Sequence, residues 1–201
     1  MMQDPEPTKN DGVSRTGGAM KLTDLVFIDT ETTGLDPRQH ELLEISVVRV
    51  HQTWVPNEKP VFTVIDEWST RVRPDNIMTA DPASLRVNGY SATGWANATP
   101  IREALEEFSK HVEGAIMVAH NVAFDAGFID TYLAVHEMPN KMHYHRLDTV
   151  SMAYAKLHDS GVTRYSLGEL CKHFGIVNEH AHTALSDARA CFELFKKLMD
   201  L

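Results

Sequence analysis

The sequence predicts an α/β fold in which a mixed β-sheet is covered by helices on both faces. Three segments typical of strands come first in the chain, and amphipathic segments with helical spacing follow them, around one more short apolar run. Helices that follow a set of strands are typical of such a layered sheet. Residues 1–20 are rich in Pro, Gly, Ser and charge without periodicity, so we expect a disordered tail before a single folded domain over 21–201.

The expected strands lie between turn signals. The first covers residues 24–30 and is followed by the turn GLDP (34–37), after which ELLEISVVRV (41–50) predicts a second strand. VFTVIDEWSTRV (61–72) predicts a third, because its flanks are rich in proline, and IMVAH (116–120) predicts a fourth.

Caps and apolar spacing mark the expected helices. Asp81 before Pro82 predicts the start of a short helix, because Asp is a favoured N-cap and proline suits the first helical position. Ser166 and Glu169 have capping-box spacing, and Gly175 is placed to end that helix. Longer helices are expected from Thr99-Pro100 onward, over about 122–136 and over about 183–200.

Composition indicates a globular protein without a membrane segment. No apolar run reaches the roughly 18 residues of a membrane helix, and the N-terminus lacks the layout of a signal peptide. Cys171 and Cys191 fall in apolar helical patterns, so we expect them to be reduced thiols in the core. We therefore expect the protein to be located in the cytoplasm. The net charge of −9 argues against a broad basic surface for duplex DNA, but it allows an enzyme that handles a short single-stranded end.

Two acids stand where the first strand ends, in VFIDTETTG (26–34). Residues two apart in a strand share a face, so Asp29 and Glu31 are expected to point the same way, with Cα atoms roughly 7 Å apart. Two carboxylates at the end of an apolar strand repel each other and resist burial. A cation is therefore expected between them.

Two predicted helices carry acids on their apolar faces. Asp125 lies in the stripe of Val122, Phe128 and Leu133, and Asp187 lies in the stripe of the last helix. A carboxylate on an apolar face is costly unless it is paired or neutralised. Together with Asp29 and Glu31, these side chains make a set of acids that point inward.

Divalent metal ions fit this set better than basic side chains do. The stripes contain no Lys or Arg, and a set of oxygen ligands selects hard ions such as Mg²⁺ or Mn²⁺. Two such ions, roughly 3.5–4 Å apart, stabilise the attacking and leaving oxygens of a phosphodiester displacement. His182, near the start of the last helix, is a candidate general base because an unperturbed pKa of about 6.5 suits proton removal near neutral pH.

Plainer alternatives stay open for these residues. Either helix acid could pair with an arginine such as Arg146 or Arg164, and the acids of the first strand could be a solvated pair. His180 is a competitor for the role of base, whereas His120 is expected to pack or to form hydrogen bonds.

Three blocks carry a family resemblance: FIDTETTG (27–34), VAHNVAFDAGFI (118–129) and HTALSDA (182–188). With YSLGELCKHFGI (165–176), they resemble the motifs of the DEDDh 3′–5′ exonuclease superfamily, in the same order and over nearly the whole of the chain from residue 24. The resemblance implies a ribonuclease H-like fold, with a central mixed sheet of about five strands.

The resemblance also implies a role for each matching residue. Asp29 would bridge both metal ions, Glu31 and Asp187 would help to hold the ion that activates water, and Asp125 would anchor the other ion. His182 would be the base. The residues expected to meet the terminal nucleotide are Thr32, Thr33, Leu35, Asn121 and Phe124.

These observations lead to one expected function and two alternatives. We expect a metal-dependent exonuclease that releases nucleoside 5′-monophosphates from DNA 3′ ends, single-stranded ends first, in proofreading or repair. An exoribonuclease that trims RNA 3′ ends and a degenerate nucleic-acid-binding module are the alternatives. A polymerase partner and a homodimer are both open, although the chain lacks the tail by which a bacterial epsilon subunit is expected to bind its polymerase.

Overall fold

The computed structural model describes residues 20–179 and 183–201 and contains a mixed five-stranded sheet in the order β3-β2-β1-β4-β5. The expected tail therefore lies almost wholly outside the described residues. The strands are β1 (Leu25–Thr32), β2 (Leu42–Thr53), β3 (Val61–Arg71), β4 (Ile116–Ala119) and β5 (Arg146–Asp148). The helices are α1 (Pro82–Val87), α2 (Ile101–His111), α3 (Val122–Val135), α4 (Thr149–Leu157), α5 (Leu167–Phe174) and α6 (Ala184–Asp200), with short 3-10 turns η1 (Met20–Leu22) and η2 (Ile77–Thr79).

Strand β1 lies at the centre of the sheet. It pairs antiparallel with β2 on one side and parallel with β4 on the other, and β3 and β5 form the two edges. All of its residues before Asp29 are buried, which is typical of a strand covered on both faces. The register places Asp29 opposite Ser46 and Glu31 opposite Glu44 of β2.

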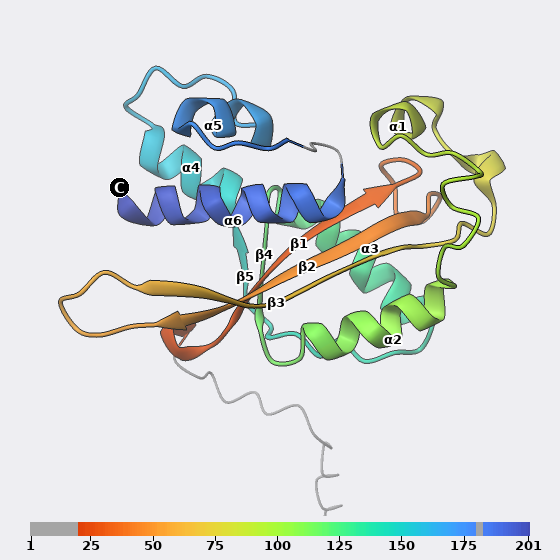
Figure 1. Ribbon diagram of the computed structural model, residues 1–201, viewed down its shortest axis with the longest axis horizontal. Helices are drawn as coiled ribbons and strands as arrows, with labels where there is room; N and C mark the ends of the chain where they lie inside the picture. The colour runs from red at the N-terminus through yellow and green to blue at the C-terminus, as the bar shows by residue number, and fades with distance from the viewer. Residues whose placement is uncertain (1–19, 180–182) are drawn as a thin grey trace, which may run out of the picture.

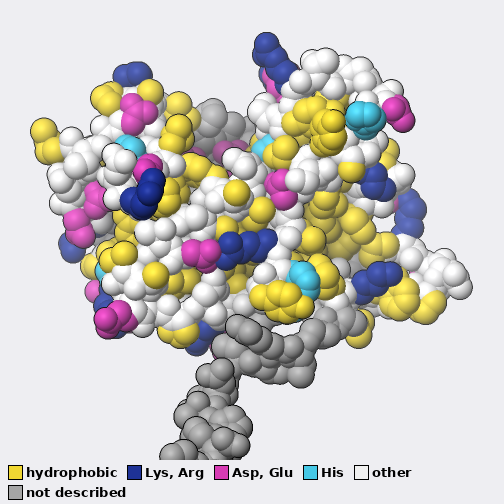
Figure 2. Space-filling view, turned by 180° about the vertical axis from the view of Figure 1, so that it is seen from behind, with side chains coloured by type: hydrophobic (Ala, Val, Ile, Leu, Met, Phe, Trp, Pro, Cys, Tyr) yellow, Lys and Arg dark blue, Asp and Glu magenta, His cyan; other side chains and the backbone are white. Residues whose placement is uncertain are grey.

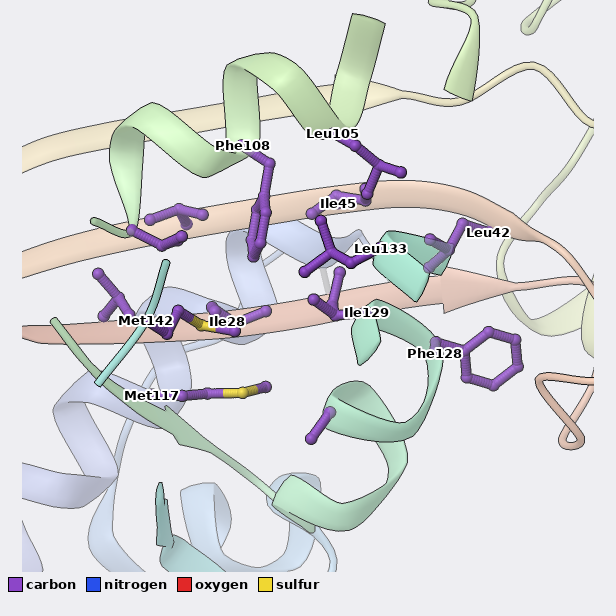
Figure 3. Packing of buried hydrophobic residues seen from close by; sticks show 14 of the residues in the cluster. Ile28, Leu42, Ile45, Leu105, Phe108, Met117, Phe128, Ile129, Leu133 and Met142 are labelled. Carbon is purple, nitrogen blue, oxygen red and sulfur yellow. The ribbon is translucent and has the colours of Figure 1, made fainter. Parts of the chain in front are cut away.

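Helices cover both faces of the sheet, as the sequence predicts (Figure 1). On one face, α2 and α3 pack against a core that includes Val26 and Ile28 of β1. Figure 3 shows Leu105 and Phe108 of α2 pointing toward the sheet in this layer. On the opposite face, Phe27 contacts Phe195 of α6, with ring centroids 5.4 Å apart, and α4 and α5 pack around α6. Alternate side chains of β1 thus pack into two separate hydrophobic cores, one on each face of the sheet.

Several local predictions can be compared directly with the structure. The Asp81 side chain accepts a hydrogen bond from the backbone of Ala83, so the predicted cap of α1 is confirmed. Gly175 ends α5 with a φ of 66°, as expected for a glycine C-cap. The predicted capping box at Ser166 is wrong in its detail, because the Ser166 side chain makes no cap hydrogen bond.

The sequence prediction missed two consecutive elements, β5 and α4. A three-residue strand carries too few positions for an alternating pattern, and α4 follows it directly through the N-cap Asp148. Within the described residues, no helix is long and apolar enough to span a membrane. Both cysteines are buried and free, which confirms the expectation of core thiols.

Candidate active site

The two acids of β1 share one face of the sheet, as their spacing predicts. Asp29 and Glu31 alternate with Thr30 and Thr32, which are more deeply buried and belong to the opposite face. Both acids therefore lie on the side of the sheet that carries α6. Neither belongs to an ion pair with a lysine or arginine among the residues that the structure describes.

Asp187 completes a group of carboxylates at the end of β1. It lies in the first turn of α6, and one carboxylate oxygen from each of Asp29, Glu31 and Asp187 lies within 4.8 Å of the others. The beginning of α6 and the end of β1 come together in this region of the fold (Figure 1). Residues more than 150 positions apart in the sequence are thus brought to one point.

Asp125 reaches the same strand from the other helical layer. It is only 3% exposed, in the first turn of α3, as its position in an apolar stripe predicts. Its Oδ1 accepts hydrogen bonds from the backbone N of Thr30, at 2.9 Å, and from the Thr30 hydroxyl, at 2.8 Å. The Arg146 alternative does not hold for this acid, because Arg146 forms its ion pair with Asp130. One oxygen of Asp125 is thus tied to β1 between the two acids of that strand.

Burial and mutual repulsion shift the pKa values of these acids upward. Burial, with the charges of Asp125, Asp187 and Glu31, raises the pKa of Asp29 well above its usual value. Burial and the charges of neighbouring acids raise the pKa of Glu31 to about 8. For Asp125, burial outweighs the hydrogen bonds from Thr30 and raises the pKa to about 7. Within residues 20–179 and 183–201, no lysine or arginine forms an ion pair with Asp29, Glu31 or Asp125, and their mutual repulsion is unrelieved there.

The donor set fits a hard divalent cation. It consists of carboxylate oxygens alone and is partly buried, and burial with mutual repulsion raises the pKa values of Asp29 and Glu31. Asp29, Glu31 and Asp187 could hold one ion, and Asp125 lies close enough to Asp29 to raise its pKa. This combination is the arrangement that the inward-pointing acids of the sequence predict.

A further acid, Glu44, belongs to this environment and was missed by sequence reasoning. It lies opposite Glu31 on β2, where burial raises its pKa and the charge of Asp187 adds to that effect. The Ser69 hydroxyl donates to its Oε1 at 3.0 Å, and the backbone of Ala184 at the start of α6 also hydrogen-bonds to it. In the sequence it alternates with apolar residues of a strand, a pattern that indicates a solvated face rather than a site.

At the end of β1 and in the loop after it, two threonines are buried and one apolar side chain is exposed. The Thr32 hydroxyl donates to the carbonyl of Gly34 at 2.6 Å, and the Thr33 hydroxyl accepts from the backbone N of Glu41 at 2.8 Å. Both threonine side chains are thus engaged within the protein, whereas Leu35 is 76% exposed. Of the expected substrate contacts in this loop, Leu35 alone presents a free side chain.

Gly34 is required by close packing in the same loop. A Cβ atom at this position would lie 2.2 Å from the ring of His40, a separation that no side-chain shift of a few tenths of an ångström relieves. His40 is fixed in turn, because its Nδ1 accepts a hydrogen bond from the backbone N of Asp36. Gly34 therefore permits the close packing against His40 in the turn that contains Leu35.

Asn121 and Phe124 lie where α3 begins. Asn121 adopts a left-handed conformation with a φ of 69°, and its backbone N donates to the Asp148 side chain at 2.9 Å. Asp148 also caps α4, so one carboxylate organises two helix starts. Phe124 is partly buried and packs against Phe128, with ring centroids 5.1 Å apart. Their roles toward a nucleotide stay predictions.

The histidines differ in how far the structure describes them. His182 and its competitor His180 lie outside the described residues, so the assignment of a base stays a prediction. His120 is held on both sides: its Nε2 lies 2.8 Å from the carbonyl of Tyr165 and its Nδ1 lies 2.9 Å from the Thr149 hydroxyl. A carbonyl only accepts, so Nε2 carries the proton, and burial lowers the pKa of His120. The expectation that His120 forms hydrogen bonds is confirmed.

Comparison with known proteins places this geometry in a family. A family model described as Exonuclease matches residues 26–195. The DNA polymerase III subunit epsilon of Treponema pallidum (strain Nichols) is 30% identical over 171 residues, which cover 85% of this chain and 74% of that protein. The PolC-type DNA polymerase III of Streptococcus pneumoniae serotype 2 (strain D39 / NCTC 7466) is 30% identical over 173 residues, which cover 85% of this chain and 11% of that protein.

A solved structure of Escherichia coli Exonuclease I in complex with a dT13 oligonucleotide superposes with a TM-score of 0.71 at 17% identity. The match covers 88% of this chain and 41% of that chain, and it confirms the predicted ribonuclease H-like fold. The family model spans most of the chain and includes Asp29, Glu31, Asp125 and Asp187. The protein therefore belongs to the exonuclease family, within the DEDDh 3′–5′ exonuclease superfamily that its motifs resemble.

Proposed function

We propose that this protein removes nucleoside 5′-monophosphates from the 3′ ends of DNA, with single-stranded ends preferred, in a reaction that depends on Mg²⁺ or Mn²⁺. The observation that carries the proposal is the cluster of Asp29, Glu31 and Asp187, whose carboxylate oxygens lie within 4.8 Å of one another beside the buried Asp125. Carboxylate oxygens gathered this closely on one face are a donor set that suits a hard divalent cation.

The residues of the cluster have separate tasks in this proposal. Asp29, Glu31 and Asp187 would hold one ion, and Asp29 with Asp125 would hold a second one. When bound, the two ions act as Lewis acids that lower the pKa of water and stabilise the attacking and leaving oxygens of the scissile phosphate. The Thr30 hydrogen bonds keep Asp125 facing β1, and the sheet keeps Asp29 and Glu31 on one face.

His182 serves as the general base. It lies five positions before Asp187 in the sequence, and its neutral imidazole would take the proton of the attacking water. Activity would then rise with pH through the pKa of His182, because only the neutral ring accepts a proton. His182→Ala should reduce the rate by a factor on the order of 10²–10⁴ and leave Mn²⁺ binding nearly unchanged. Full activity of that variant would move the role of base to another residue, with His180 next to test.

A single-stranded 3′ end suits the surface of the molecule. The chain carries a net charge of −9, and on the face in Figure 2 the Lys and Arg side chains are scattered among acids and apolar groups. Duplex binding depends on many phosphate contacts from basic side chains, whereas a strand end needs few. Leu35, exposed in the loop directly after β1, offers apolar contact to an unstacked base. That the Exonuclease I neighbour was solved with an oligonucleotide supports the same choice.

The relatives also suggest a setting in replication or repair. The Treponema protein is by name a subunit of DNA polymerase III, and the Streptococcus protein is by name a DNA polymerase III, so a polymerase is the proposed protein partner and the cytoplasm is the proposed compartment. The aligned part of the Treponema protein is 30% identical to this chain.

Matched oligonucleotides test the proposal. Wild-type protein with Mn²⁺ is incubated with 5′-labelled DNA that has single-stranded, blunt or mismatched 3′ ends, and with RNA of the same sequence. We expect ladders that shorten from the 3′ end and release mononucleotides, fastest on single-stranded DNA, and no release by Asp187→Asn. Faster cleavage of RNA would establish the exoribonuclease alternative, and no release from any substrate would establish a degenerate binding module.

A further inference from the structure

Asn178 bridges two successive side chains of α6 at the candidate metal site. It lies in the connection between α5 and α6, nine positions before Asp187. Its Nδ2 donates to Asp187 Oδ1 at 2.6 Å, and its Oδ1 accepts from the Ser186 hydroxyl at 2.6 Å. The three side chains thus form one short chain of hydrogen bonds that ends on a carboxylate of the acid cluster.

The chemistry of the partners fixes the orientation of the amide. A carboxylate oxygen only accepts, so the amide must turn its NH₂ group toward Asp187. The remaining amide oxygen then faces Ser186, whose hydroxyl is free to donate to it. If the amide were reversed, two acceptors would face each other across 2.6 Å. The Asn178 amide therefore has one orientation, which the hydrogen bond from the Ser186 hydroxyl stabilises.

The contact constrains how Asp187 presents its carboxylate. Each carboxylate oxygen has more than one lone-pair direction, so an oxygen that accepts from Asn178 still has room for a cation. A single donor on one oxygen restricts rotation of the whole group. Asp125 shows the same design on the opposite side of β1, where Thr30 donates twice to one oxygen. Both helix-borne acids of the cluster thus have a neutral donor that positions them without cancelling their charge.

We propose that Asn178 is a positioning residue that fixes the Asp187 carboxylate for metal binding. The proposal rests on the metal-dependent function proposed above and adds a residue outside the acids and the base. A purely structural role, in which Asn178 only anchors the connection to α6, would stabilise the fold without affecting the affinity for metal. The two roles therefore predict different outcomes for a metal titration.

The experiment compares Asn178→Ala with Ser186→Ala in the full chain. Asn178→Ala removes the donor to Asp187, whereas Ser186→Ala removes only the group that locks the amide and keeps that donor. Binding of Mn²⁺ alone, without substrate, is measured by calorimetric titration, and the melting temperature without metal is measured for each variant. Asn178→Leu, which keeps approximately the volume of the side chain, replaces Asn178→Ala if the latter does not fold.

We expect the dissociation constant for Mn²⁺ to rise about tenfold in Asn178→Ala and no more than about threefold in Ser186→Ala, since loss of a group that orients a ligand typically costs 10–100-fold. Exonuclease activity of Asn178→Ala should then recover as Mn²⁺ is raised to saturation. Unchanged Mn²⁺ binding in Asn178→Ala and Asn178→Leu, with a lowered melting temperature, would overturn the proposal in favour of a structural anchor. If the wild type itself binds no Mn²⁺, the metal-dependent function fails first, and the two failures are distinguished.

Discussion

The two ends of β1 handle acidic side chains in opposite ways. Asp24, just before the strand, accepts hydrogen bonds from Arg49, at 2.8 and 3.0 Å, and lies 2.8 Å from a ring nitrogen of His51. Burial acts to raise its pKa, but these partners outweigh burial and hold the pKa of Asp24 below its usual value. At the other end, Asp29 and Glu31 are buried among acids, and their pKa values are raised.

The difference separates an acid that stabilises the fold from acids that lower its free energy of unfolding. At the Asp24 end, the sheet supplies its own cations and the carboxylate ties β1 to β2. At the Asp29 end, neutral groups donate to two of the acids: the Thr30 hydroxyl to Asp125 and the Asn178 amide to Asp187. Neutral donors orient a carboxylate and leave its charge for a ligand. The two ends of β1 thus differ: next to its start lies an acid paired with an arginine, and at its end lie the acids that we propose to bind metal.

The largest expected effect comes from comparing Asp29→Asn with Asp24→Asn, one substitution at each end of β1. Asp29→Asn should reduce mononucleotide release by at least about 10³-fold, or about 4 kcal/mol, because the shared ligand of both proposed ions is lost. Without metal, it should raise the melting temperature at pH 8, because it removes a repelled charge. Asp24→Asn should do the reverse: activity stays, and the melting temperature falls by about 2–4 °C for a loss of about 1 kcal/mol.

Product release and thermal unfolding of both variants measure this pair of predictions. A metal-free Asp29→Asn protein that melts well below the wild type would contradict the comparison, because Asp29 would then stabilise the fold as Asp24 does.

A second prediction concerns the pH dependence of stability without metal. Glu31 has a pKa of about 8 in the folded protein against a usual value of 4.5, so the folded state binds more protons than the unfolded chain between these values. The free energy of unfolding should therefore fall as the pH rises through this window. Thermal melts from pH 5 to pH 8 in the presence of a chelator measure the slope. Glu31→Gln should flatten it, and an unchanged slope would show that Glu31 titrates near its usual value.

The smallest expected effect concerns Glu44. Glu44→Gln keeps an oxygen that can accept from Ser69 and Ala184 but removes a negative charge next to Glu31. Affinity for Mn²⁺ should weaken about three- to tenfold, less than the 10–100-fold typical of a group that orients a metal ligand, and activity at saturating Mn²⁺ should be retained. Glu67→Gln is the matched control, because Glu67 has its own cation in Arg189, at 2.6 Å. Equal effects of the two substitutions would mean that only total charge matters.

The positions of the main acids could be predicted because each one violates a local pattern. Asp29 and Glu31 lie in the second half of a strand whose first half is apolar, and Asp125 interrupts an apolar stripe, so their inward position is predictable from periodicity alone. The first four strands, the helices on both faces, the N-cap of α1 and the glycine C-cap of α5 also follow from local signals.

The remaining parts of the site depend on tertiary placement. Glu44 is buried only because β2 pairs with β1 in one register and α6 starts above it. Asn178 meets Asp187, nine positions later in the sequence, through a tertiary hydrogen bond that no local pattern announces. Thr30 looks like an ordinary strand residue until α3 brings Asp125 to it. Each is an ordinary polar residue in sequence, so periodicity carries no signal for it.

The most direct test of the central claim is a calorimetric titration of the wild type with Mn²⁺ at pH 7, repeated in two buffers of different ionisation enthalpy. If Asp29, Glu31, Asp125 and Asp187 form a metal site, binding is saturable and releases protons, because the pKa of Glu31 is about 8 and that of Asp125 is about 7 before the ion enters. Asp29→Asn should abolish the proton release. Heats that are independent of the buffer, or binding that Asp29→Asn leaves intact, would contradict the account.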